Sequence, residues 1–266
     1  METFQKNLFL RVISGFVGVV GFLFFLILGG IPFKLLVIVV ATLGLVEYFN
    51  LVKNMGFRPF KFQTIVASII LTYFASNLNF IETTLVVFLV LFLLFLLSIP
   101  IYYNSGRGME DGAISIYGFL YLSIPSALLV NLRNMGLEYV LFVVFITWIN
   151  DIFAFFIGRF FGRKKLAPII SPNKTWEGFI GGLVFCIIFG IAYAHVYKFP
   201  LIKYAIFSAI LSITGTLGDL IESVIKREAK VKDSGIFLLG HGGVLDRVDS
   251  LIVNIPVYFI LISVFT

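Results

Sequence analysis

The chain has 266 residues, of which 60% are hydrophobic and only 13% are charged, and its mean hydropathy is +1.06. Soluble domains are about 45–50% apolar and about 25% charged, so the composition excludes an ordinary soluble domain. The apolar residues stand in long runs rather than at alternating positions, which indicates membrane-spanning helices and excludes a β-barrel. The formal net charge is +6 and there is one cysteine, Cys186, so an intramolecular disulfide and a cysteine-based zinc site are excluded.

The apolar runs predict an all-α, polytopic integral membrane protein that forms a single membrane-embedded domain. A helix that crosses a bilayer needs roughly 20 apolar residues. We expect about nine transmembrane helices, near residues 12–30, 31–51, 64–78, 84–103, 112–132, 137–158, 178–197, 202–225 and 244–266. Glu47 interrupts the second run, and the third run is short. The first run is read as a retained span, because it is long for a signal peptide and lacks a good cleavage site.

The basic residues predict the orientation of these helices. With a cytoplasmic N-terminus, most of the 20 lysines and arginines fall in cytoplasmic loops, as the positive-inside rule requires. The protein is then expected in the cytoplasmic membrane, with its polar loops and active site facing the cytoplasm, where nucleotides are available. Residues 1–136 are interpreted as lipid-facing scaffold spans, and residues 137–266 as the spans that carry the active site.

A first polar block begins with Asn150 and Asp151, inside an apolar run. An ionisable group in a membrane span is costly, so Asp151 should face a bundle interior or a wet cavity and have a partner. Ala154 and Gly158 share its helical face and would let a helix or a ligand come close. Two interpretations stay open: a functional carboxylate, or a structural one paired with a lysine or arginine.

The same block continues through residues 171–178, which are expected to be a loop leading into a helix. Ser171 is a plausible N-cap for a turn, with Pro172 after it. Exposed amides at such a turn, together with Lys174, would suit a phosphate. Alternatively, Lys174 and Trp176 only mark the membrane surface.

A second polar block begins inside the eighth predicted span. Asp219, Glu222, Ser223 and Lys226 are spaced i, i+3, i+4 and i+7, so they share one helical face. The small residues 214–218 before them permit close packing. A basic stretch and a glycine-rich turn follow, and then the last span.

Together these features are typical of a nucleotide-phosphate site. Glycines let backbone amides approach phosphate oxygens, the start of the last helix adds its dipole, and basic side chains neutralise a triphosphate. Asp219, Asp246 and Asp249 offer hard oxygen ligands, which suit Mg²⁺. The alternative is a solvated polar loop whose charges pair with one another.

At this point the chain resembles the CDP-diacylglycerol synthases, also called phosphatidate cytidylyltransferases. The residues that carry the resemblance are Ser223, Lys226, Arg227, Lys232, Asp233, Gly235, Leu238, His241, Gly242, Gly243, Asp246, Arg247 and Asp249. The blocks at 150–151 and 171–178 also look like family features. Leu239 departs from the pattern, where a proline or small residue is usual. The resemblance is strong from about residue 140 onward, whereas the N-terminal half matches only in its hydrophobic spans.

The resemblance implies that CTP and phosphatidic acid give CDP-diacylglycerol and pyrophosphate in phospholipid biosynthesis. It implies Mg²⁺ at Asp219, Asp246 and Asp249, with a second metal ion left open. It implies catalytic roles for Asp219, Lys226, Arg227, Asp246 and Asp249. Substrate binding is assigned to Asn150, Asp151, Lys174, Thr175, Glu177, Ser223, Lys232, Asp233, His241, Gly242, Gly243 and Arg247. The expected partners are the two substrates and the lipid bilayer but no nucleic acid, with a homodimer left open.

Three other classes are weighed against this interpretation. A CTP-dependent polyprenol kinase shares the membrane setting and the nucleotide but would release CDP. A CDP-alcohol phosphatidyltransferase is only faintly resembled by Asp151 and Ala154. An ion-coupled transporter would use Glu47, Asp151 and Asp219 as an ion path, but transporters often have repeated halves, and no repeat is evident here.

Overall fold

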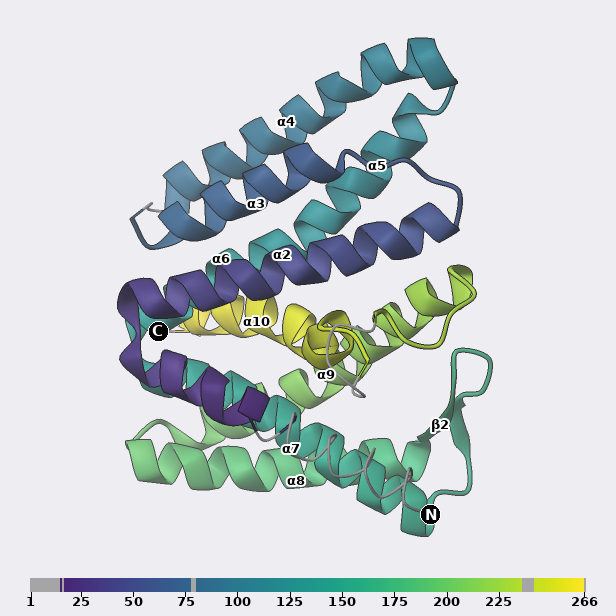
Figure 1. The fold of residues 1–266 in the computed structure, drawn as a ribbon. Helices are drawn as coiled ribbons and strands as arrows, with labels where there is room; N and C mark the ends of the chain where they lie inside the picture. The colour runs from purple at the N-terminus through teal and green to yellow at the C-terminus, as the bar shows by residue number, and fades with distance from the viewer. Residues whose placement is uncertain (1–14, 16, 78–79, 236–241, 266) are drawn as a thin grey trace. The chain divides into compact units, whose positions relative to one another are not determined.

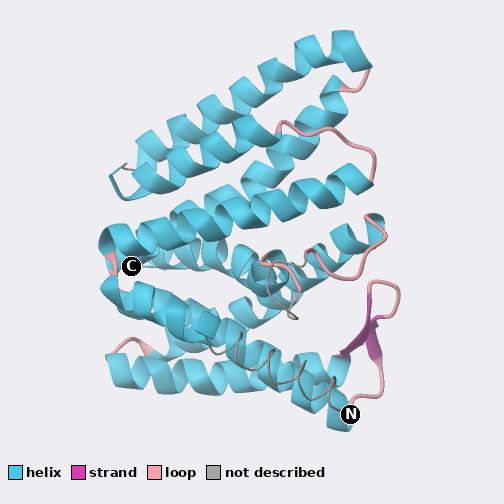
Figure 2. Cartoon of the chain, in the orientation of Figure 1, coloured by secondary structure: helices cyan, strands magenta, loops and turns pink. Residues whose placement is uncertain are grey.

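The computed structural model describes residues 15, 17–77, 80–235 and 242–265, and it is built almost entirely of helices (Figure 1, Figure 2). An apolar helix at Val17–Leu28 comes first. The elements that follow are α2 (Gly30–Asn54), α3 (Lys61–Phe74), α4 (Phe80–Ser105), α5 (Gly108–Gly118), α6 (Ile124–Met135), α7 (Leu137–Phe161), β1 (Lys165–Ala167), β2 (Ser171–Thr175), α8 (Trp176–Tyr197), α9 (Leu201–Glu228) and α10 (Leu245–Phe265). The predicted all-α fold is therefore confirmed, with a small hairpin added.

The helix lengths confirm a polytopic membrane protein. Among the described residues, seven helices are long and apolar enough to cross a bilayer. One of them, Gly108–Met135, joins α5 and α6 through a π-helical turn at Phe119–Ser123. The helix at Val17–Leu28 is shorter, and α3 has only 14 residues. The count of nine spans and the side of the N-terminus stay predictions.

The contacts divide the chain into two compact units. The first unit comprises Met1–Asn134 and Glu228–Arg247, and the second comprises Met135–Arg227 and Val248–Thr266. The residues that carry the family resemblance, called the signature from here on, lie mostly between Glu228 and Arg247. This stretch, the signature segment, groups with the N-terminal helices although it lies near the C-terminus of the sequence.

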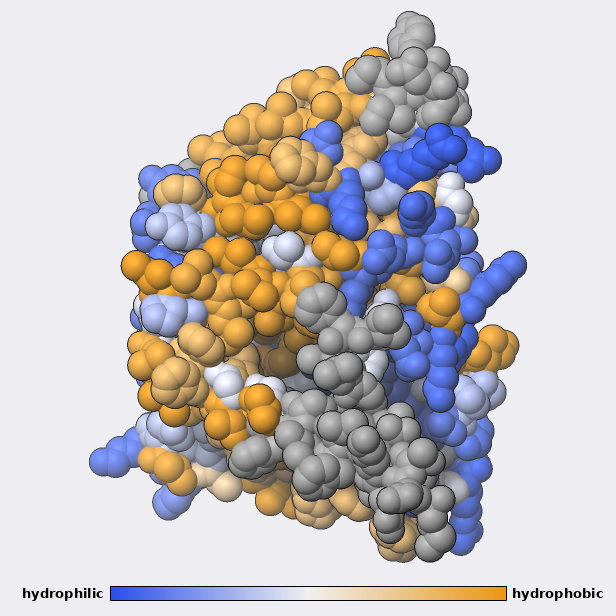
Figure 3. Space-filling view, in the orientation of Figure 1, coloured by the Kyte–Doolittle hydropathy of each residue, from blue (hydrophilic) through white to orange (hydrophobic). Residues whose placement is uncertain are grey.

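In the first unit, α3, α4 and α5 lie side by side (Figure 1). Phe60, Leu71, Leu94 and Phe119 are buried between them. The face seen over α3 and α4 is mainly hydrophobic, as expected for helices in contact with lipid (Figure 3).

In the second unit, α7 and α8 pack closely because glycines line their contact. A Cβ at Gly178 would lie 2.5 Å from the carbonyl oxygen of Ala154 and 3.0 Å from the Cα of Gly158. A Cβ at Gly182 would lie 2.7 Å from Oδ1 of Asn150. Small residues let helix backbones approach in membranes, where no hydrophobic force drives helices together.

The segment before α8 corrects the sequence analysis. Ser171 does not cap a turn but begins β2, which pairs antiparallel with β1 (Figure 2). The helix cap is Thr175, whose Oγ1 accepts a hydrogen bond from the amide of Gly178 at 3.2 Å. Ser171 pairs with Ala167, and this long-range pairing replaces the local turn.

We predict that Gly178→Ala destabilises the protein by about 1–3 kcal/mol, because the new Cβ meets backbone atoms that cannot rotate away. Thermal unfolding of the purified protein in detergent measures the effect. Gly21→Ala is the control, because nothing lies within 4 Å of a Cβ there. Equal melting temperatures for the two variants would contradict the close packing of α7 on α8.

Candidate functional site

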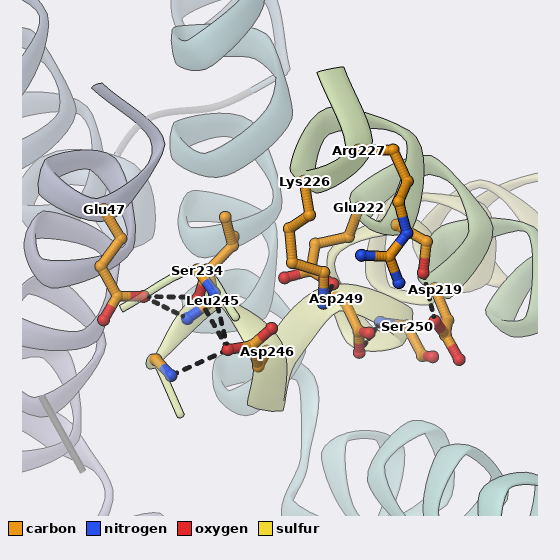
Figure 4. Close-up of polar contacts among 12 residues, drawn as sticks. Glu47, Asp219, Glu222, Lys226, Arg227, Ser234, Leu245, Asp246, Asp249 and Ser250 are labelled. Carbon is orange, nitrogen blue, oxygen red and sulfur yellow. Dashed lines mark hydrogen bonds and ion pairs between the residues drawn. The ribbon is translucent and has the colours of Figure 1, made fainter. Parts of the chain in front are cut away.

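Asp246 organises the turn that precedes its own helix, α10. Its Oδ2 accepts hydrogen bonds from the amide of Ser234 at 3.0 Å, the Ser234 hydroxyl at 3.0 Å and the amide of Gly243 at 2.8 Å (Figure 4). Gly242 has φ +81°, and a Cβ there would lie 2.8 Å from the same oxygen. The two glycines of the signature therefore fit closely around the Asp246 carboxylate, and the Gly243 amide is used inside the turn.

Lys174 and Asp219 form an ion pair within the second unit. Nζ of Lys174 lies 2.7 Å from Oδ2 of Asp219 and donates to the carbonyl oxygen of Thr216 at 3.3 Å. The Ser223 hydroxyl donates to Oδ1 of Asp219 at 3.3 Å. The structure thus brings together residues from β2 and α9 that are 45 positions apart in the sequence.

Asp219 is also close to Asp249, because α9 and α10 meet at a glycine. A Cβ at Gly218 would lie 2.8 Å from the carbonyl oxygen of Asp249 and 3.1 Å from the Cα of Ser250. The carboxyl groups of Asp249 and Asp151 both interact electrostatically with Asp219, and Asp151 interacts with Lys174 as well. Three predicted site carboxylates therefore share one neighbourhood in this unit.

The basic end of α9 is held by specific partners. Lys226 forms an ion pair with Glu222, one turn earlier on the helix, and Glu222 is fully buried. Nε of Arg227 donates to the carbonyl oxygen of Ile170 in the hairpin turn at 3.3 Å. All four members of the predicted polar face lie on α9, as their spacing indicates.

Asn150 is buried and joins α7 to α9. Its Oδ1 accepts from the Ser212 hydroxyl at 2.6 Å, and its Nδ2 donates to Oγ1 of Thr216 at 3.3 Å. Asn254 on α10 makes a similar link, accepting from Thr214 and donating to Thr147. Sequence reasoning missed Asn254, although an amide inside an apolar run is a usable signal.

Thr175 and Glu177 hold the hairpin at the start of α8. Thr175 is the helix cap described above. The Glu177 carboxylate accepts hydrogen bonds from the amides of Arg163 at 3.0 Å and Lys164 at 3.2 Å, just after α7 ends. These contacts fix the hairpin that carries Lys174.

The remaining predicted residues lie near the signature turn. Lys232 and Asp233 are exposed in the loop after α9, and Arg247 is exposed on the first turn of α10. His241 lies outside the described residues, so its predicted role is untested. Glu47, noted in the sequence only as an interruption and in the transporter alternative, contacts this turn directly. It accepts hydrogen bonds from the amides of Val244 and Leu245, and its Oε2 lies 3.1 Å from the Ser234 hydroxyl oxygen.

The three predicted metal ligands lie on two helices, Asp219 on α9 and Asp246 and Asp249 on α10. Within the described ranges, no group of three or more His, Cys, Asp or Glu side chains is arranged closely enough to hold an ion. The donor chemistry of Asp219, Asp246 and Asp249 nevertheless fits Mg²⁺, which prefers carboxylate oxygens. Asp246 and Asp249 lie one helical turn apart on α10. The three-residue metal site stays a prediction.

We predict that Asn150→Ala lowers stability by about 1–3 kcal/mol, because the buried hydroxyl of Ser212 and the half-buried hydroxyl of Thr216 each lose a partner. Thermal unfolding in detergent measures this loss. Asn173→Ala, at an exposed position of the hairpin, should leave the melting temperature unchanged. A variant of Asn150 as stable as the control would remove the linking role of this amide.

Comparison with known proteins shows which family this chain matches. Residues 9–265 match the model of the cytidylyltransferase family. The match includes the N-terminal half, where the sequence pattern showed only hydrophobic spans.

Curated relatives agree over almost the full length. The chain is 32% identical over 267 residues to a phosphatidate cytidylyltransferase of Bacillus subtilis (strain 168), covering 96% of this chain and 98% of that protein. It is 34% identical over 254 residues to one of Staphylococcus haemolyticus (strain JCSC1435), covering 95% and 98%. It is 32% identical over 260 residues to one of Staphylococcus aureus (strain COL), again covering 95% and 98%. Because the family model and these relatives match almost the whole chain, the chain belongs to the cytidylyltransferase family.

Proposed function

We propose that the protein transfers the cytidylyl group of CTP to phosphatidic acid, giving CDP-diacylglycerol and pyrophosphate. A phosphate oxygen of the lipid attacks the α-phosphorus of CTP, the bond between the α-phosphorus and the bridging oxygen breaks, and pyrophosphate leaves with the bond electrons. The observation that carries this proposal comes from a membrane-spanning chain of this family. In it, Lys174 forms an ion pair with Asp219, and α9 packs at Gly218 against the backbone of Asp249. The relatives named above carry the name of this activity.

The reaction asks mainly for alignment and charge neutralisation. A lipid phosphate is already anionic at neutral pH, so the site needs no strong general base. Lys226, Arg227, Lys232 and Arg247 are assigned to the phosphate groups of the two substrates, whose negative charges repel one another. Lys174 keeps Asp219 in place through their ion pair and offers a further positive charge.

Asp219, Asp246 and Asp249 are the residues we assign to Mg²⁺. When bound there, the ion would neutralise negative charge on the phosphates, as metal ions do in phosphoryl chemistry. Asp246 uses Oδ2 within its own turn, and this fixes the direction in which the carboxylate points. Asp151, near both Asp219 and Lys174, is assigned to the substrate-binding region, with a second metal ion left open.

The setting in the membrane follows from the substrates. The acyl chains of phosphatidic acid stay in the bilayer while CTP arrives from water, so the site must be accessible from both. We place the protein in the cytoplasmic membrane with the N-terminus and the site toward the cytoplasm, because the basic residues favour that side. The homodimer left open by the sequence stays a prediction.

The polyprenol kinase alternative is not favoured, since the relatives are named phosphatidate cytidylyltransferases. Product analysis separates the two activities, because the kinase releases CDP whereas the cytidylyltransferase releases pyrophosphate. Purified protein given CTP, phosphatidic acid and Mg²⁺ should yield pyrophosphate and CDP-diacylglycerol in equal amounts. Release of CDP, or no lipid-dependent turnover, would contradict the proposal.

We predict that Asp246→Asn lowers kcat by about 10²-fold or more, because the negative charge assigned to the metal is lost. Asparagine keeps an oxygen that can accept the hydrogen bonds of Ser234 and Gly243, so the turn should survive. The kcat for pyrophosphate release and the melting temperature in detergent are measured together. Wild-type turnover in this variant would remove Asp246 from the metal site.

We also predict that removal of divalent ions with EDTA abolishes pyrophosphate release, and that Mg²⁺ restores it. The reason is that three carboxylates cannot align a triphosphate without a cation between them. The matched sample receives EDTA saturated with Mg²⁺ beforehand and should keep full activity. Turnover that persists in excess EDTA would argue against a metal-dependent reaction.

A further inference from the structure

A carboxylate in the N-terminal half of the chain contacts the signature segment directly. Glu47 lies on α2, a membrane-spanning helix that is far in sequence from the signature, and it is only 6% exposed. A buried carboxylate in such a helix is costly unless hydrogen-bond donors surround it. The hydrogen-bond donors around Glu47 therefore indicate the role of this carboxylate.

Among the described residues, the hydrogen-bond donors to Glu47 come from the signature segment. Oε1 accepts the amide of Val244 at 3.0 Å, and Oε2 accepts the amide of Leu245 at 2.8 Å. The Ser234 hydroxyl lies 3.1 Å from Oε2 (Figure 4). Since α10 begins at Leu245, these two amides are among those that have no acceptor within the helix. Glu47 thus caps α10 from another helix, where its negative charge also matches the helix dipole.

Two glycines of the segment are explained by this contact. A Cβ at Gly235 would lie 2.5 Å from Oε1, 2.8 Å from Cδ and 3.1 Å from Cγ of Glu47. A Cβ at Gly243 would collide with the Glu47 carboxylate and with the Ser234 hydroxyl. The backbone of the segment is therefore packed against Glu47 on both sides of the 236–241 stretch.

Ser234 connects Glu47 to Asp246. Its hydroxyl oxygen lies 3.1 Å from Oε2 of Glu47 and 3.0 Å from Oδ2 of Asp246, and its amide donates to the same Asp246 oxygen. The Asp246 side chain stands one residue beyond Leu245, whose amide Glu47 holds. Two routes, through Ser234 and through the start of α10, therefore transmit the position of Glu47 to Asp246.

We propose that Glu47 is a positioning residue, which fixes the signature segment and sets the direction of the Asp246 carboxylate for the reaction. The inference rests on the proposed function for its effect on turnover, but the contact itself does not depend on it. The same contacts argue against the transporter alternative, in which Glu47 would line an ion path, because both of its oxygens accept hydrogen bonds from the segment.

The first test is Glu47→Gln. Glutamine has one acceptor oxygen, so its amide group must face the amide of Val244 or Leu245, donor against donor. We expect kcat for CDP-diacylglycerol formation to fall at least about 10-fold while KM for CTP changes less, because alignment is lost rather than substrate binding. Glu47→Asp keeps both oxygens and should recover part of the activity.

A second readout does not depend on turnover. Hydrogen exchange of peptides covering residues 242–250 should be faster in Glu47→Gln than in the wild type, because one of the two amides at the start of α10 loses its acceptor. Peptides from α7 and α8 should exchange at the wild-type rate. Glu110→Gln is the control, because it removes the same charge from an exposed position in the same unit. It should alter neither hydrogen exchange nor kcat.

Gly235→Ala tests the same contact without removing the charge, since its Cβ displaces Glu47. It should lower kcat, and combined with Glu47→Ala it should cost no more than Glu47→Ala alone. This variant decides the matter if Glu47→Gln does not fold in detergent. An active wild type with unchanged kcat and exchange in the folded variants would overturn the inference. A wild type that makes no CDP-diacylglycerol would overturn the proposed function instead, and exchange would still test the contact.

Discussion

Polar groups within a bilayer have no water to bind, and several key polar side chains among the described residues are held by another part of the protein. This constraint explains why the charged and amide side chains of the proposed site have specific partners. Glu47 accepts hydrogen bonds from two amides at the start of α10, and Asp219 forms an ion pair with Lys174. Asn150 accepts a hydrogen bond from the Ser212 hydroxyl on α9. The same contacts that satisfy these groups also fix the residues around the proposed site.

Glycines make these contacts close enough to matter. Gly218 lets α9 approach the backbone of α10 at Asp249, and Gly178 lets α8 approach α7. Gly235 and Gly243 leave room for the Glu47 carboxylate, and Gly242 leaves room for Asp246. The signature glycines are thus explained in this structure by packing around carboxylates. The phosphate cradle expected from the sequence would have to use other amides than that of Gly243, which already donates to Asp246.

The hairpin β1–β2 has a comparable positioning role in the second unit. Glu177 holds the chain where α7 ends, Thr175 caps α8, and Arg227 binds the hairpin turn. Lys174 is thereby placed against Asp219. Residues that a motif assigns to substrate binding therefore also hold one another in place through hydrogen bonds and ion pairs. A reaction that depends on the alignment of its substrates benefits from side chains held in this way.

The sequence by itself determined the membrane class, the all-α fold and the family, because long apolar runs and a dense motif are local properties of the chain. It also placed Asp219, Glu222, Ser223 and Lys226 on one helical face, since 3.6 residues per turn fixes that spacing. It could not give the β1–β2 pairing, which made the expected cap at Ser171 wrong, nor the partners of Lys174 and Asn150. Only the tertiary structure decided that Glu47 holds the start of α10. That contact joins residues 198 positions apart, and hydrogen bonds at such separations depend on how helices pack rather than on any local pattern.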